Sequence, residues 1–96
     1  MKRDAIAIKR EDNVATALRD LGKGEVAAVG IGDGTVSVTL LDAITFGHKF
    51  ALRDIAHGED ILKYGEVIGR ATVAIPQGAH AHVQNIESLR GRGDLA

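Results

Sequence analysis

The sequence has no cysteine and no tryptophan, a single proline, and only two phenylalanines and one tyrosine. Without cysteine, neither a disulfide nor a thiolate metal site can form. No apolar run is long enough to cross a membrane, and charges occupy the start of the chain, where a signal peptide would need its apolar region. We therefore expect a cytoplasmic protein.

The chain also has no large excess of positive or negative charge. The formal net charge is -1, so the chain has no general attraction for phosphate backbones or anionic lipid surfaces. We expect neither nucleic acid nor a membrane as a partner.

The 96 residues are enough for one domain with one modest core. Hydrophobic residues at 45% and charged residues at 26% are typical of a soluble globular protein. We predict a single domain over residues 1–88 and a flexible tail over residues 89–96, which are rich in glycine and charge. The tail contains Arg92-Gly93-Asp94, the integrin-binding tripeptide by letter, and we attribute so short a match to chance.

The apolar core is predicted in the stretch from Ile44 to Ala71, because all three aromatic residues lie there. Aromatic side chains supply the largest apolar area per residue. The residues that we expect in this core are Phe46, Phe50, Leu52, Ile55, Ile61, Tyr64, Val67 and Ile68.

One helix is predicted over residues 14–21, with Asp12 or Asn13 as its cap and Gly22 at its end. Its apolar residues have the i, i+3, i+4, i+7 spacing of an amphipathic helix, so we expect this stripe to pack on a sheet. The stripe consists of Val14, Ala17, Leu18 and Leu21.

About six short strands are predicted from alternating apolar residues. They cover residues 4–9, 25–31, 35–41, 66–75 and 79–86, together with part of the aromatic stretch. Gly32-Asp33-Gly34 is typical of a hairpin turn, since both central positions can need a positive φ. In the strand after this turn, we expect Val36, Val38 and Leu40 to face the core, and Thr35, Ser37 and Thr39 to face solvent. No internal repeat is visible, and the pattern favours a small barrel-like or clip-like β domain.

Two histidines at the end of the chain are candidates for chemistry. His80 and His82 lie two apart on a predicted strand, so both side chains leave the same face. Imidazoles placed in this way can share a metal ion or a carboxylate. The exposed polar face of an edge strand is the more common explanation of an isolated His-x-His pair, and the residues alone leave both interpretations open.

The other two histidines differ in their surroundings. His48 and Lys49 put an imidazole and an ammonium group on a predicted loop, where they can grip an anion, although a turn with solvated charges explains them equally well. His57 precedes Gly58, and we predict that it ends a helix, where the local carbonyls favour a histidine. We give His57 a structural role only.

Four segments carry a resemblance to a known family. DNVATAL (12–18), FGHKFALRDI (46–55), ILKYGEVIGRAT (61–72) and GAHAHVQN (78–85) resemble, in order and spacing, the N-terminal domain of altronate dehydratase and its relatives. Related domains occur in galactarate dehydratase and in the small subunit of sulfolactate sulfo-lyase. The resemblance implies a mainly β, SAF-type domain with a β-clip fold, to which we add the N-terminal helix and short helical turns.

The resemblance also implies a function. Enzymes of this family dehydrate sugar acids to 2-keto-3-deoxy acids, commonly with a divalent metal such as iron or manganese, and the SAF domain works beside a much larger catalytic domain. Because the chain ends soon after its HVQN segment, we expect that larger part to be a separate large dehydratase subunit, which would hold most of the metal ligands.

The chain is therefore expected to be the small subunit of a sugar-acid hydro-lyase, forming a composite active site with its partner. It should be inactive alone, because so small a domain has little room for a deep pocket, and it should self-associate when the partner is absent. Two alternatives stay open. One is the small subunit of sulfolactate sulfo-lyase, and the other is a non-catalytic module that binds a sugar acid.

The site residues follow from the matched motifs. His48 and Lys49 fall on the family's GHK, and His80 and His82 fall on its HVHVHN run. The resemblance implies that these four residues bind the substrate. We expect the three imidazoles to meet around one anion or metal ion.

The sequence departs from the family pattern at two places. The third histidine of the HVHVHN run is Gln84, and the His-Pro that often precedes the DNVAVAL motif is Lys9-Arg10. Glutamine can hydrogen-bond but cannot shuttle a proton. A role that needs the third imidazole is therefore in doubt in this chain.

Overall fold

The computed structural model describes residues 3–88, and it folds this part of the chain into nine strands without any helix. None of the described residues belongs to a helix that could cross a membrane. The predicted tail, with its Arg-Gly-Asp tripeptide, lies outside the described residues. The strands are β1 (Ala5–Ala7), β2 (Val14–Ala17), β3 (Val26–Ile31), β4 (Gly34–Thr39), β5 (Lys49–Ala51), β6 (Asp60–Lys63), β7 (Glu66–Ala71), β8 (His80–Ala81) and β9 (Ile86–Ser88).

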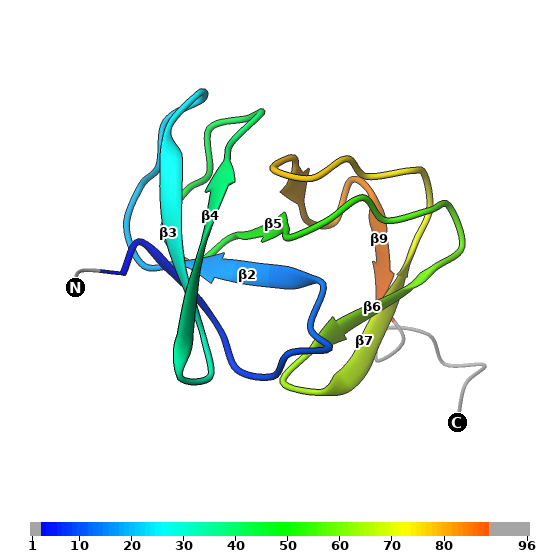
Figure 1. Cartoon of the computed structure of the whole chain (residues 1–96). Helices are drawn as coiled ribbons and strands as arrows, with labels where there is room; N and C mark the ends of the chain where they lie inside the picture. The colour runs from blue at the N-terminus through cyan, green and yellow to red at the C-terminus, as the bar shows by residue number, and fades with distance from the viewer. Residues whose placement is uncertain (1–2, 89–96) are drawn as a thin grey trace.

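The strands form two sheets. The larger has the order β4-β3-β1-β2-β5-β8, and the smaller has the order β6-β7-β9. β1 pairs with β3 in parallel, whereas the other strand pairs are antiparallel. Figure 1 shows the β3-β4 hairpin at one side and β6, β7 and β9 at the other, with β2 and β5 between them. The predicted mainly β character is confirmed.

The predicted helix over residues 14–21 is wrong, because Val14–Ala17 is strand β2, hydrogen-bonded to β1 on one side and β5 on the other. Ala15 packs in one apolar cluster and Val14 in another, so both faces of this strand are buried. A strand buried on both faces has apolar residues at successive positions, which imitate helical spacing. Leu18, part of the predicted helical stripe, is 45% exposed.

The predicted short helical turns are also absent from residues 3–88. His57 lies in a tight turn, where Gly58 has a φ of 85°, and its side chain is exposed. It does not end a helix. The turn chemistry that stops a helix and the chemistry that reverses a strand both use glycine with positive φ, so the sequence could not separate them.

The hairpin prediction is confirmed, with changes in detail. β3 and β4 pair along their whole lengths around a two-residue turn, in which Gly32 has a φ of 55° and Asp33 has no positive φ. Val38 and Leu40 are buried as expected, but Val36 is 45% exposed, because the tip of the hairpin extends beyond the core. In β1, Ala5 and Ala7 are buried and Ile6 is half-buried, and Ile8, which follows the strand, is 42% exposed.

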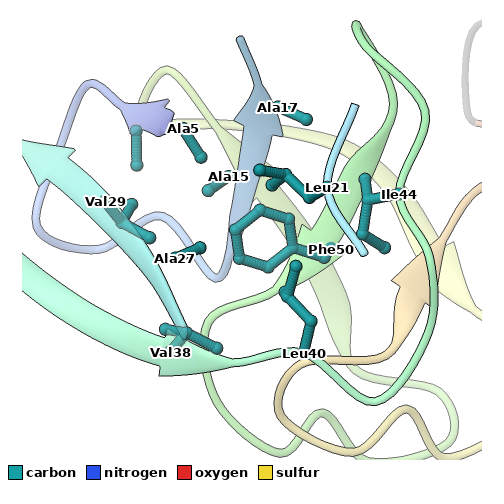
Figure 2. Close-up of a cluster of buried hydrophobic side chains, with 11 residues drawn as sticks. Ala5, Ala15, Ala17, Leu21, Ala27, Val29, Val38, Leu40, Ile44 and Phe50 are labelled. Carbon is teal, nitrogen blue, oxygen red and sulfur yellow. The ribbon is translucent and has the colours of Figure 1, made fainter. Parts of the chain in front are cut away.

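The core consists of two clusters on the two sides of β2 and β5. Phe50 has no exposed surface and lies at the centre of the first cluster (Figure 2), while Ile55 and Ile61 belong to the second. Leu52 and Ile68 pack against these clusters as partly buried residues. Three predicted core residues are exposed instead: Phe46 (64%) and Tyr64 (54%) lie in turns, and Val67 (43%) lies near the start of β7.

The same type of turn occurs four times among the described residues, a repeat that the sequence had not revealed. Its glycine has a φ of 84–86° and donates its N–H to a carbonyl in, or directly after, a neighbouring strand. The residue three positions earlier is apolar and buried, and these residues pair across isolated bridges, Leu21 with Ile44 and Ile55 with Ile75. The four turn glycines are Gly24, Gly47, Gly58 and Gly78.

Two of these glycines allow a matched test of why the turn needs glycine. A Cβ on Gly78 would lie 2.2 Å from the carbonyl oxygen of Thr39, whereas nothing lies within 4 Å of a Cβ on Gly47, although both φ angles are nearly equal. Gly47→Ala should lower the free energy of unfolding by about 1 kcal/mol, the cost of a left-handed residue. Gly78→Ala should cost about 2 kcal/mol more, because the backbone must move. Urea unfolding of both variants measures the difference, and equal losses would contradict the close approach at Gly78.

Candidate functional site

Strand pairing brings the two histidine segments together. β5 pairs with β8 in an antiparallel register that places Lys49 opposite Ala81 and Phe50 opposite His80. His48 directly precedes β5, and His82 directly follows β8. Residues more than thirty positions apart in sequence therefore meet at the edge of the larger sheet.

The turn that carries His48 lacks the glutamate that closes two of its repeats. In the turns over residues 21–25 and 55–59, the last residue is a glutamate whose carboxylate accepts a backbone N–H, from Gly22 to Glu25 and from Ala56 to Glu59. His48 occupies the same position in the turn over residues 44–48. Its side chain does not close the turn and instead contacts the other imidazoles.

The three imidazoles form one cluster. The ring centroids of His48 and His82 are 4.3 Å apart, those of His48 and His80 are 5.2 Å apart, and those of His80 and His82 are 5.6 Å apart. Nδ1 of His48 lies 3.0 Å from Nε2 of His80. His80 is thus on an edge strand, but all three rings are half-buried against each other. A role in substrate binding stays a prediction.

Side chains from the loops hold the second histidine segment in place. The amide of Asn85 donates from Nδ2 to the carbonyl oxygen of His80 at 2.8 Å, and its Oδ1 accepts the N–H of His82 at 2.9 Å. Asp42 accepts the N–H of His80 at 2.9 Å. The predicted strand over residues 79–86 is therefore interrupted by a turn, because Asn85 satisfies backbone groups that would otherwise need a strand partner.

The electrostatics of the cluster favour the neutral forms of His80 and His82 beside a cation. Burial lowers the pKa of His80, and His48 and Lys49 lower it further against the opposing effect of Asp42. Burial also lowers the pKa of His82, with additional contributions from His48, Lys49 and His80. For Lys49, burial and then the charge of Lys63 hold the pKa below its usual range. An anion placed among these groups would relieve the repulsion between the two lysines.

A pocket of about 320 Å³ lies beside the cluster. This volume is at the low end of the range for small-molecule sites, which is on the order of 300 to 1,000 Å³. Lys49 and His82 were predicted as site residues, whereas Lys63 was missed, although its KYG segment belongs to one of the matched motifs. The lining residues are Lys49, Lys63, Tyr64, Glu66, Ile68, His82, Val83, Ile86 and Ser88.

The imidazoles do not fit a metal ion held by this chain alone. Metal ligands direct their nitrogen lone pairs at one point, but Nδ1 of His48 and Nε2 of His80 lie 3.0 Å apart and bond to each other instead. Among residues 3–88, no group of three or more histidine, aspartate or glutamate side chains is arranged to hold a metal. We derive no step through a metal on these residues.

Comparisons with known proteins agree on one family. The sequence model described as the altronate/galactarate dehydratase SAF domain matches residues 3–89. The altronate dehydratase of Escherichia coli (strain K12) is 45% identical over 80 residues, which are 83% of this chain and 15% of that protein. The altronate dehydratase of Bacillus subtilis (strain 168) is 44% identical over 84 residues, which are 86% of this chain and 16% of that protein.

A smaller relative is also similar. The (2R)-sulfolactate sulfo-lyase subunit alpha of Chromohalobacter salexigens is 45% identical over 58 residues, which are 60% of this chain and 62% of that subunit. The chain thus spans about one-sixth of the length of the two altronate dehydratases, and less than two thirds of the sulfo-lyase subunit. The similarity to the dehydratases covers one domain of a larger protein.

Proposed function

The chain belongs to the altronate/galactarate dehydratase SAF domain family, and on this premise we propose that it is the sugar-acid-binding small subunit of a hydro-lyase. The observation that carries the proposal is the convergence of His48, His80 and His82 beside Lys49, from two segments joined by the pairing of β5 with β8. A cluster of imidazoles next to a partly buried ammonium group suits an anionic substrate rich in hydroxyls.

The proposed reaction is the dehydration of an aldonic or aldaric acid. The proton on the carbon next to the carboxylate leaves, the hydroxyl on the neighbouring carbon departs, and the resulting enol becomes the ketone of a 2-keto-3-deoxy acid. Negative charge develops on the carboxylate during proton removal, and the ammonium groups of Lys49 and Lys63 across the pocket can stabilise it. The imidazoles of His48 and His82 can hydrogen-bond the hydroxyls.

A partner protein is part of the proposal. The pocket is small and open to solvent, and the described residues supply cations and imidazoles but no obvious complete set of general base, general acid and metal ligands. We place the remaining groups, including a divalent metal such as iron or manganese, on a large dehydratase subunit. The sulfo-lyase relative is named as subunit alpha of its enzyme, and the shares covered show that its length is similar to that of this chain.

The test compares the purified chain, the large subunit, and the two together with altronate, galactarate and sulfolactate. We expect turnover only from the reconstituted pair. In that pair, a His48→Ala, His82→Ala double variant should lose about 100-fold or more of the rate, the usual contribution of positioned acid–base groups. His57→Ala is the matched control, because this exposed histidine lies in the turn over residues 55–59, outside the cluster.

Each outcome of this test decides between functions. Turnover by the isolated chain would overturn the subunit proposal. Full activity of the reconstituted double variant would show instead a non-catalytic binding module. Activity with sulfolactate alone would favour the sulfo-lyase alternative, which the similarity to subunit alpha supports.

A further inference from the structure

Gln84, His80 and His48 form one line of hydrogen bonds. Nε2 of Gln84 lies 3.0 Å from Nδ1 of His80, and Nε2 of His80 lies 3.0 Å from Nδ1 of His48. The two imidazole planes differ by 13°, and their centroids are 5.2 Å apart. Because the nitrogens are so much closer than the centroids, the rings meet edge to edge, as a linear N–H···N hydrogen bond requires.

The amide of Gln84 determines which group donates and which accepts in each of these hydrogen bonds. The amide nitrogen of glutamine donates hydrogen bonds and accepts none. The same nitrogen of Gln84 also lies 3.4 Å from the carbonyl oxygen of His80, which can only accept, so the amide orientation satisfies both contacts. Nδ1 of His80 must therefore carry a lone pair, and the proton of the neutral ring is on Nε2.

The second step follows from the first. Because Nε2 of His80 carries the proton, it donates to Nδ1 of His48, which must carry a lone pair. The proton of neutral His48 is then on its own Nε2. Within residues 3–88, this nitrogen has no hydrogen-bond partner, and the ring is half-buried against His82.

We infer that Gln84 is a positioning residue that sets the tautomers of His80 and His48 and leaves Nε2–H of His48 as a hydrogen-bond donor for a ligand oxygen. The tautomers rest on the hydrogen bonds alone. The ligand oxygen, a carboxylate or hydroxyl of the sugar acid, rests on the proposed function. Gln84 is an exposed side chain that touches no expected substrate group and acts only through His80.

The test is ¹⁵N NMR of the full chain labelled on its histidine rings, at neutral pH and without substrate. Bare and protonated ring nitrogens differ strongly in ¹⁵N chemical shift, so the shifts of Nδ1 and Nε2 report the tautomer populations of each ring. In the wild type, we expect Nδ1 to be the bare nitrogen of both His80 and His48. In Gln84→Ala, the ratio of the two His80 tautomers should fall by roughly two- to tenfold, the loss of one hydrogen bond.

A second variant, Gln84→Glu, should reverse donor and acceptor in the hydrogen bond to His80. The carboxylate of Gln84→Glu can only accept, so Nδ1 of His80 should become protonated. Gln77→Ala is the matched control: Gln77 donates from Nε2 to the carbonyl of Leu52, has no hydrogen bond to a histidine among residues 3–88, and should leave the ring spectra unchanged. Because Gln84 and Gln77 are both exposed, the variants should keep their amide spectra apart from local shifts.

The inference is overturned if Nδ1 of His80 is protonated in the wild type, or if neither Gln84 variant changes the tautomer ratio. This experiment uses no substrate and no partner. Failure of the dehydratase assay would therefore leave the tautomer result intact, and a wrong tautomer prediction would leave the assay result intact.

Discussion

Replacing Phe50 with alanine is expected to lower the free energy of unfolding by about 4 kcal/mol, within the range found for large-to-small changes in a core. Phe50 has no exposed surface, and alanines make up much of its surroundings, among them Ala5, Ala15 and Ala27 (Figure 2). An alanine cannot move into a cavity without its backbone, so the space left by the ring should stay open. The loss would be a large part of the total free energy of unfolding of a small domain, typically about 5–15 kcal/mol.

Urea unfolding measures this loss, and Phe46→Ala is the matched control. Phe46 is 64% exposed, so the same truncation there should change stability by no more than about 0.5 kcal/mol. Phe50→Leu fills part of the space and gives a smaller loss if the alanine variant does not fold. Similar losses at Phe46 and Phe50 would contradict the placement of the core. Because Phe50 pairs with His80, broadened histidine resonances in Phe50→Leu would show that the core positions the cluster.

The sequence predicted those parts of the fold that local chemistry determines. The hairpin around Gly32 and Asp33 follows from turn residues between alternating apolar residues, and the structure contains it. The family was identified from four motifs spread over most of the chain, and the family match confirms this resemblance. Both signals depend on order and spacing along the chain, which the sequence contains directly.

The helix could not be excluded from the sequence, because the burial of β2 depends on its distant neighbours. Val14 and Ala15 are both buried only since β1 and β5 flank β2 and separate clusters cover its two faces. The large apolar side chain of Phe46 also led to a wrong prediction of burial. It occupies the turn position that Lys23, His57 and Gln77 fill in the other repeats, a position open to solvent in all four turns.

The candidate site was predicted in part. The family motifs indicated His48, Lys49, His80 and His82, and the structure places the three imidazoles together. Lys63 and Gln84 lie inside matched motifs, but nothing in the sequence assigns either of them a contact at the site. Lys63 reaches the pocket because β6 packs against β2, the neighbour of β5. The contact of Gln84 with His80 depends on a turn that Asn85 closes. Such contacts require the tertiary structure.

Asp12→Ala is expected to lower the free energy of unfolding by about 4 kcal/mol, because it leaves several backbone donors without a partner. Asp12 is 4% exposed, and its carboxylate accepts four backbone N–H groups, two from its own loop and two from the turn between β6 and β7. That turn has positive φ at both Tyr64 and Gly65. The strain at Tyr64 needs such support, since it has a side chain.

The role of Asp12 extends to the pocket. Lys63, Tyr64 and Glu66 line the pocket from the turn that Asp12 holds, and Asn13 holds β6 through Asp60 and Leu62. The two residues thus join the larger sheet to the smaller one, whereas the sequence had suggested a helix cap. Loss of the carboxylate should therefore loosen one wall of the pocket as well as lower stability.

The same carboxylate makes stability depend on pH. Burial raises the pKa of Asp12, but the hydrogen bonds from Gly65, Lys9, Tyr64 and Ile8 together outweigh burial and lower it. A carboxyl group with a lowered pKa in the folded state stabilises fully above its unfolded pKa of about 3.9, and this contribution is lost as the pH falls through the folded value. The wild type should lose this part of its stability below about pH 4, whereas Asp12→Asn should not.

Urea unfolding at neutral pH and below pH 4 measures both effects, with Asp54→Ala as the matched control. Asp54 is exposed and accepts one backbone N–H, from Gln77, so its loss should cost only about 1 kcal/mol. Asp12→Asn keeps one acceptor oxygen but turns an amide nitrogen toward N–H donors, and it should lie between the wild type and Asp12→Ala. Equal losses for the Asp12 and Asp54 variants, or the same acid dependence in wild type and Asp12→Asn, would show that Asp12 does not join the sheets. The pocket wall would then have to be held by the packing of β6 and β7 alone.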